Sequence, residues 1–400
     1  MNEHFPHPSD HISNTTPLEY FQKGMAPVRQ QMASGGTLKA CIECRTMERH
    51  GKISGRQRQL LKTGVSLDKF VPTMTSSPWL KQWRDSINDS TLITTPQDWQ
   101  VELGNYCNSG CVFCKPTESS RLAVEFKKLG IEHEPPPKNW SDDPVLVERF
   151  IESLVSSPKV RYVHFIGGET VIMPAFKRIL EAMVEHGLHE TAAMGFTTNM
   201  TVWPEDVIEL TAKFKEVNLG LSIETMTNLN DYVRWPSDIN SIKEILQKWV
   251  ELGHSRKWLT TLRVTPTVLT VHELWTVYQY AIDNDVNVES CNFLHTPRFM
   301  RPTVLPRSKT YWIADHLENW VIQQKLQTEK LVINQRNPQF RRDATLQDAL
   351  SYVNYLRTAD DETNLLPELV AHLKKLESSR NNNILNYLPE YANLFRSVGY

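Results

Sequence analysis

The feature that most constrains the fold of this chain is a regular alternation of short β-rich runs with amphipathic helical runs from Asp98 onward. Alternation of this kind is typical of βα units around a parallel sheet, which places the chain in the α/β class. Right-handed crossovers would curl consecutive units into a partial (βα)6 barrel or a wound sheet. The expected strands cover residues 98–104, 161–167, 192–198, 217–224, 261–269 and 286–294.

The rest of the chain predicts three further regions around this core. Residues 1–17 mix His, Pro, Ser, Asn and Thr without periodicity, so we expect a disordered arm. Residues 18–97 carry a Cys pair, a basic run and several turn signals, which indicates a separate small module. The α/β core should extend over residues 98–306, and the helical, polar residues 307–400 should form a C-terminal extension.

Charge and hydropathy argue against two classes of partner. Lys and Arg number 44 and Asp and Glu number 46, so a net charge of −2 supplies no global field that attracts nucleic acid or an anionic membrane. The basic run from Arg45 to Lys62 contains Glu48 and no interleaved aromatic residue, which favours a solvated helix face over a nucleic-acid patch.

The N-terminus shows no signal-peptide pattern, and no apolar stretch is long enough to span a bilayer. We therefore expect a cytoplasmic protein with no membrane partner.

Three of the six cysteines form a tight triplet directly after the first expected strand. Cys107, Cys111 and Cys114 lie in the segment CNSGCVFC, at the sheet edge where α/β proteins place active sites. Three thiolates can each ligate one iron of a 4Fe-4S cluster and leave the fourth iron open, and no fourth Cys follows in this loop. A structural zinc site completed by Cys291 or a His is the alternative.

The spacing C-x3-C-x2-C after the first strand of a βα repeat resembles the radical S-adenosylmethionine (SAM) superfamily, and Phe113 also matches the family pattern. In that family the open iron chelates the amino and carboxylate groups of SAM. The resemblance implies that a reduced cluster passes an electron into the sulfonium of SAM, whose carbon–sulfur bond breaks to give a 5'-deoxyadenosyl radical that abstracts a substrate hydrogen. It also implies that Phe113 packs near the adenine, with a core aromatic as the alternative.

Two further segments match the family at the ends of later strands. Gly167, Gly168 and Glu169 follow the second strand and resemble the Gly-Gly-Glu-Pro segment that holds the amino group of SAM, with Thr170 in place of the Pro. Glycines at a strand end let the backbone approach a ligand and expose its N–H and C=O groups. The third strand closes in a Thr-Asn pair at Asn199, as the family's third strand does.

The fourth strand adds candidates for the ribose and the carboxylate of SAM. Ser222 and Glu224 should share one strand face because successive residues alternate sides, and a hydroxyl beside a carboxylate suits two ribose hydroxyls. Arg234 resembles the family arginine that meets the SAM carboxylate through a fork of donors. A helix cap is the alternative for Glu224, and a surface salt bridge is the alternative for Arg234.

The first Cys pair extends the resemblance to radical SAM proteins with a twitch module, a shortened domain that binds an auxiliary cluster. Cys41 and Cys44, followed by Glu48, resemble the N-terminal motif of one such group. The pair would supply two ligands of a possible second iron-sulfur cluster, completed by Cys291 or a non-Cys ligand; zinc or two buried thiols are the alternatives.

The resemblance also implies the partners of the chain. These are SAM, a substrate that the sequence does not identify, and an external electron donor such as flavodoxin or ferredoxin. A peptide, a nucleotide and a small molecule all stay open as substrates. His164, His295 and Arg298 lie near strand ends and are weaker candidates for substrate contact. The competing interpretation of the whole chain is a zinc- or iron-sulfur-binding module without SAM turnover.

Overall fold

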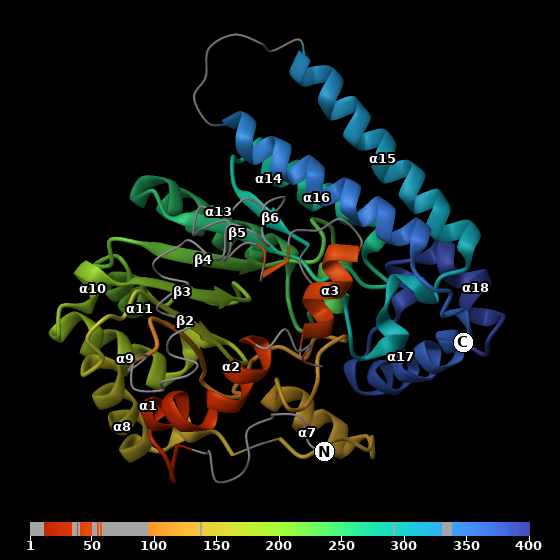
Figure 1. Ribbon diagram of the computed structural model, residues 1–400. Coiled ribbons are helices and arrows are strands. Elements are labelled where there is room, and N and C mark those ends of the chain that lie inside the picture. Colours follow the sequence, from red (N-terminus) through yellow and green to blue (C-terminus); the bar gives the residue numbers. More distant parts are fainter. Residues whose placement is uncertain are drawn as a thin grey trace.

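The described part of the chain is built on one six-stranded parallel sheet whose strand order follows the sequence (Figure 1). The computed structural model describes residues 12–33, 38, 41–49, 54, 55, 57, 95–136, 138–290, 293–329 and 338–400. The strands are β1 (Asp98–Glu102), β2 (Tyr162–Ile166), β3 (Ala193–Thr198), β4 (Val217–Ser222), β5 (Leu259–Arg263) and β6 (Asn287–Glu289). The expected α/β class with six parallel strands is therefore confirmed.

Helices connect the strands and cover one face of the sheet, as the alternating pattern predicts (Figure 1). The helix α8 shows why these elements begin where they do: Asp143 accepts a hydrogen bond from the Val145 N–H, and Pro144 occupies the first turn. The connecting helices and 3₁₀ turns are α7 (Ser120–Lys128), η5 (Trp140–Asp142), α8 (Pro144–Val155), η6 (Thr170–Ile172), α9 (Pro174–Glu185), α10 (Leu188–Thr191), α11 (Glu205–Thr211), α12 (Leu229–Val233), α13 (Ile239–Arg256), η7 (Val271–Glu273) and α14 (Leu274–Asp283).

The core lies between the sheet and these helices. Phe165 of β2 and Phe196 of β3 are fully buried and pack against Phe176 of α9, with ring centroids 5.1 and 5.4 Å apart. Residues that alternate with them point to the opposite face, where the Tyr162 hydroxyl lies 3.0 Å from Nδ1 of His164. One face of the sheet is thus apolar and covered, and the other carries polar side chains.

The last two strands end earlier than the sequence predicts. The expected strand 261–269 is β5, which begins at Leu259 and ends at Arg263. The Thr265 N–H donates to the Glu224 carboxylate instead of to a neighbouring strand, and Pro266 has no N–H to donate. Among the described residues of the expected strand 286–294, β6 covers Asn287–Glu289, and the N–H of Ser290 donates to a side chain, not to the ladder.

The described N-terminal residues form short helices that lie against the core. They are α1 (Pro17–Glu19), the π-helical turn η2 (Tyr20–Gly24), α2 (Ala26–Ala33) and α3 (Ile42–Arg49). Arg149 of α8 donates to the backbone carbonyls of Ile12 and Ser13 at 2.9 and 3.0 Å, which attaches the segment before α1 to the core. Residues 1–11 and 58–94 lie outside the described residues, so the arm and the twitch-like module stay predictions.

The C-terminal residues are helical, as predicted, and their first two long helices pack on the last βα unit. The long helices α15 and α16 form a pair that projects beyond β6 (Figure 1), and Tyr278 of α14 donates to Asp348 of α16 at 2.8 Å. No described helix combines the length and the apolar character needed to cross a membrane. The elements are η8 (Arg298–Met300), η9 (Pro302–Val304), α15 (Arg307–Glu329), α16 (Pro338–Thr358), η10 (Thr363–Leu365), α17 (Leu366–Arg380), η11 (Ile384–Asn386), η12 (Pro389–Tyr391) and α18 (Ala392–Arg396).

Candidate cofactor site

The cysteine triplet lies in the loop between β1 and α7, which we call the Cys loop (residues 107–114). Backbone hydrogen bonds fix this loop against the segment that follows α12: the Gly110 N–H donates to the Trp235 carbonyl at 2.6 Å, and the Val112 N–H donates to the Val233 carbonyl at 2.9 Å. The loop is therefore held by main-chain contacts, which do not depend on a bound cofactor.

One cavity of about 380 Å³ brings most of the predicted residues together. This volume lies within the usual range of small-molecule sites. All three cysteines of the Cys loop line it. The predicted SAM-binding residues that line it are Phe113, Gly167, Gly168, Asn199 and Arg234. The cavity also includes Glu102, Ser109 and Glu118, which the sequence analysis did not single out. Glu102 could have been found, because it ends a strand at the same edge as the cysteines.

Cys111 is buried, Cys107 and Cys114 are partly buried, and the chemistry of the three thiols suits a soft metal centre. Burial raises the pKa of Cys107 to about 12, and it also raises the pKa of Cys111 and of Cys114. Thiolates are the form that binds metal, so loading this site should release protons. Three thiolates select iron-sulfur clusters, zinc or Cu(I) over hard cations. Within the described ranges, no three His, Cys, Asp or Glu side chains converge on a point that one metal ion could occupy.

The Gly-Gly-Glu segment packs directly on the chain that leads into the Cys loop. The Gly168 N–H donates to the Gly104 carbonyl and the Glu169 N–H donates to the Tyr106 carbonyl, both at 2.8 Å. A Cβ at Gly168 would lie 2.3 Å from the Tyr106 carbonyl oxygen, and Gly167 has φ +152. The expectation that these glycines expose their N–H groups to a ligand is wrong for Gly168, because the Gly104 carbonyl accepts its N–H. Glycine is required here for the close approach of two backbone segments.

The buried carboxylate of Glu169 adjoins Gly168 of the cavity wall but is not itself among the residues that line the cavity. Its Oε2 accepts the Asn199 N–H at 2.6 Å, whereas its Oε1 is buried with no hydrogen-bond partner among the described residues. Burial raises the pKa of this carboxyl to about 7. A buried oxygen without a partner is costly, so a donor such as the ammonium group of SAM fits this position.

Asn199 joins the end of β3 to the Cys loop. Its Nδ2 donates to Oδ1 of Asn108 at 2.9 Å and to Oγ of Ser109 at 3.0 Å, and its Oδ1 accepts the Thr201 N–H at 3.0 Å. The side chain therefore bonds the two residues between Cys107 and Gly110. Asn108 and Ser109 stand inside the predicted motif, but spacing alone does not reveal their partners.

Glu224 and Arg234 form a buried ion pair. Nη1 of Arg234 donates to Oε1 of Glu224 at 2.8 Å, and Oε2 accepts the Thr265 N–H at 2.7 Å. The Arg234 side chain is 12% exposed, which contradicts the alternative of a surface salt bridge. β4 ends at Ser222, so Glu224 lies beyond the strand instead of sharing its face with Ser222, and neither residue lines the cavity. Burial raises the pKa of Glu224 to about 7.

The remaining candidates lie outside this cavity. Cys41 and Cys44 are free thiols one helical turn apart at the start of α3, and Cys291 lies outside the described residues. His164 points to the polar face of the sheet, and burial lowers its pKa to about 4. Arg298 pairs with Glu362 of the C-terminal extension at 2.7 Å.

Comparison with known proteins identifies the family. Residues 101–281 match the model of the Radical SAM superfamily, and this range contains the Cys loop, the Gly-Gly-Glu segment and Arg234. This part of the chain is therefore a radical SAM domain. The range begins within β1 and ends within α14. The radical SAM domain therefore contains every element that lines the cavity.

Individual relatives are distant. The sporulation killing factor maturation protein SkfB of Bacillus subtilis (strain 168) is 21% identical over 202 residues, which are 46% of this chain and 43% of that protein. The chain thus matches less than half the length of this relative. Solved structures with a likeness include Streptococcus suis SuiB bound to S-adenosylmethionine, at 15% identity and TM-score 0.39 over 68% of this chain and 57% of that one. Another is native anSMEcpe with bound AdoMet, at 15% identity and TM-score 0.41 over 58% and 62%.

Proposed function

We propose that this chain is an enzyme that binds a 4Fe-4S cluster and SAM in the cavity behind the Cys loop and abstracts a hydrogen atom from a substrate. The observation that carries the proposal is the shared cavity: three soft thiols and a buried arginine line it within the radical SAM domain. When bound, the reduced cluster and SAM would supply the electron and the 5'-deoxyadenosyl radical on which this chemistry depends.

Different side chains would bind the cluster, the ammonium group of SAM and the carboxylate of SAM. Cys107, Cys111 and Cys114 would hold the cluster. The unpartnered Oε1 of Glu169 would accept a hydrogen bond from the SAM ammonium group. Arg234 would donate to the SAM carboxylate while Glu224 keeps its guanidinium in place. No general acid or base is required, so the role of the protein is to orient the ligands and to exclude water.

The decisive experiment measures SAM cleavage by the anaerobically reconstituted protein. With dithionite as reductant, we expect about four irons and four sulfides at the Cys loop and the formation of 5'-deoxyadenosine. The triple variant Cys107→Ala, Cys111→Ala, Cys114→Ala should lose this cluster and the cleavage. A zinc-loaded protein without labile sulfide, or a cluster protein that leaves SAM intact, would instead establish a binding module without turnover.

Three finer assignments belong to the same proposal. A flavodoxin or a ferredoxin would deliver the electron in place of dithionite. The five cysteines in the described part of the chain are free thiols, which suits a reducing compartment such as the cytoplasm. The relative SkfB is a maturation protein, so a peptide is the first substrate class to test, by transfer of deuterium from labelled substrate to 5'-deoxyadenosine.

A further inference from the structure

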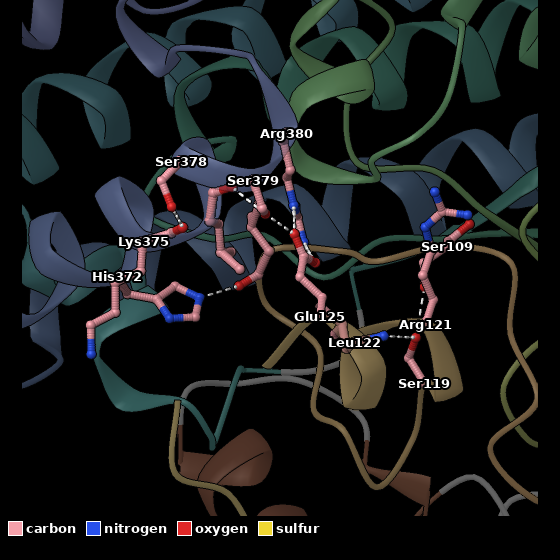
Figure 2. Close-up of polar contacts among 12 residues, drawn as sticks. Ser109, Ser119, Arg121, Leu122, Glu125, His372, Lys375, Ser378, Ser379 and Arg380 are labelled. Carbon is pink, nitrogen blue, oxygen red and sulfur yellow. Dashed lines mark hydrogen bonds and ion pairs between the residues drawn. The ribbon is translucent and has the colours of Figure 1, made fainter. Parts of the chain in front are cut away.

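The helix α17 of the C-terminal extension contacts the first helix after the Cys loop through a buried ion pair. Nε and Nη2 of Arg380 donate to Oε1 and Oε2 of Glu125 at 2.9 and 2.6 Å, and Ser379 donates to Oε1 at 2.5 Å (Figure 2). The Arg380 side chain is only 1% exposed. A bidentate, charge-assisted ion pair of this kind fixes both the position and the orientation of the Arg380 side chain relative to Glu125.

Arg380 also packs on the Cys loop itself. A Cβ at Gly110 would lie 3.2 Å from Nη2 of Arg380 and 3.6 Å from Oε2 of Glu125, so the ion pair lies directly against the loop between Cys107 and Cys111. The guanidinium carbon of Arg380 lies 4.8 Å from the ring centroid of Trp235, whose carbonyl accepts the Gly110 N–H. The C-terminal extension therefore contacts the part of the loop that separates the first two cysteines.

A second residue of α17 reaches the same loop. Nε2 of His372 lies 3.1 Å from the Val112 carbonyl, between the second and third cysteines (Figure 2). That carbonyl can only accept, so Nε2 must carry the proton. Contacts from α17 thus reach both halves of the Cys loop, although this helix lies outside the radical SAM domain of residues 101–281.

The ion pair places two opposite charges close to the cysteines. Burial raises the pKa of Cys111, and the charges of Arg234 and Arg380 oppose that rise. Nη1 of Arg380 is buried and has no hydrogen-bond partner among the described residues. Both charges of the Arg380–Glu125 pair therefore lie in the interior beside the Cys loop, where little water screens them.

We propose that Arg380 is a positioning residue through which the C-terminal extension holds the Cys loop and sets the reduction potential of the cluster bound there. This inference rests on the proposed function. A cation near a cluster favours the state with one more electron, and an anion disfavours it, because the Coulomb energy of that electron has opposite sign in the two cases. Arg380 and Glu125 should therefore shift the potential in opposite directions.

The test is an EPR-monitored redox titration of the reconstituted protein and three variants. Arg380→Met leaves Glu125 unpaired, and we expect a midpoint potential more negative than that of wild type. Glu125→Gln leaves Arg380 unpaired, and we expect a more positive potential. Arg380→Lys keeps the charge and should stay nearer to wild type than Arg380→Met does. The matched control is Arg301→Met, which breaks a 3.0 Å ion pair to Glu362 in the C-terminal extension and should leave the potential unchanged.

A loss of packing alone would move both partner variants the same way, so shifts of the same sign, or no shift, overturn the inference. If Arg380→Met does not fold by circular dichroism, Glu125→Gln decides: a positive shift supports the inference and its absence overturns it. Failure of the proposed function looks different, because wild-type protein would then hold no cluster at the Cys loop or would leave SAM intact.

Discussion

Arg234 and Glu224 are joined by a 2.8 Å hydrogen bond in the interior of the protein, and Arg234 lines the same cavity as Cys107 and Cys111. Burial of either charge alone would be costly, because a buried ion needs a partner. The pair therefore allows a cation to stand beside the cysteines without exposing it to water. Arg234 keeps further N–H donors for a ligand after it has bonded Glu224.

Replacing either partner should weaken SAM binding. We expect Arg234→Ala and Glu224→Ala each to raise the Kd for SAM by about ten- to one-hundredfold, the cost of losing one charged hydrogen-bond partner. Because the residues act as a pair, the double variant should lose less than the sum of the two. Calorimetric titration of cluster-loaded protein measures this. Arg178→Ala, which breaks an exposed pair with Glu148, is the control. If both variants keep the cluster and bind SAM as tightly as wild type, the assignment fails.

Glu169, which adjoins Gly168 of the cavity wall, provides an independent test of the proposed SAM site. Glu169→Gln keeps the size of the side chain but removes the negative charge that would meet an ammonium group. We expect the Kd for SAM to rise by about tenfold or more, since hydrogen bonds to charged groups contribute about 1.5–3 kcal/mol. The exposed Glu190→Gln, which loses its ion pair with Lys215 and its contact with His189, should bind SAM normally. Equal affinities for wild type and Glu169→Gln would show that the unpartnered oxygen does not face SAM.

Sequence spacing predicted the elements well but not the partners of individual side chains. The pattern after Asp98 predicted six parallel strands because hydrophobic periodicity reports local structure. It also predicted that Gly167, Gly168 and Arg234 would lie beside the cysteines, since strand ends meet at one edge of the sheet. The pattern predicted a strand over residues 217–224 and therefore placed Glu224 within it, whereas β4 ends at Ser222. Periodicity does not fix the last residue of a strand.

The contribution of the C-terminal extension is the clearest case of what sequence reasoning misses. Arg380 lies 255 positions from its partner Glu125, and neither stands in a recognisable motif. Only tertiary packing brings α17 to the Cys loop. Contacts between residues so far apart in the chain leave no periodic signal in a single sequence.

Acid should destabilise the fold through His164. Burial lowers its pKa to about 4, and the charge of Arg263 adds to this effect. The unfolded chain binds a proton near pH 6.5, so this stabilisation is complete above that pH and is lost as the pH falls towards 4. We expect wild type to lose about 2 kcal/mol of unfolding free energy through this group between pH 7.5 and pH 5. Urea unfolding of His164→Gln should show a smaller loss. The exposed His254→Gln should behave as wild type does, and an unchanged pH slope in His164→Gln would rule this origin out.

The last prediction concerns Cys41 and Cys44, which lie one helical turn apart and outside the cavity of the Cys loop. Two thiols at this spacing can ligate one metal centre, but they need further ligands from elsewhere in the chain. If they hold an auxiliary iron-sulfur cluster, the triple variant of Cys107, Cys111 and Cys114 should keep about four irons after reconstitution, and Cys41→Ala in that background should remove them. Iron and sulfide analysis measures both values, and Cys291→Ala tests the proposed third thiol. A triple variant without iron would refute the auxiliary cluster, whereas zinc without sulfide would assign the pair to a structural site.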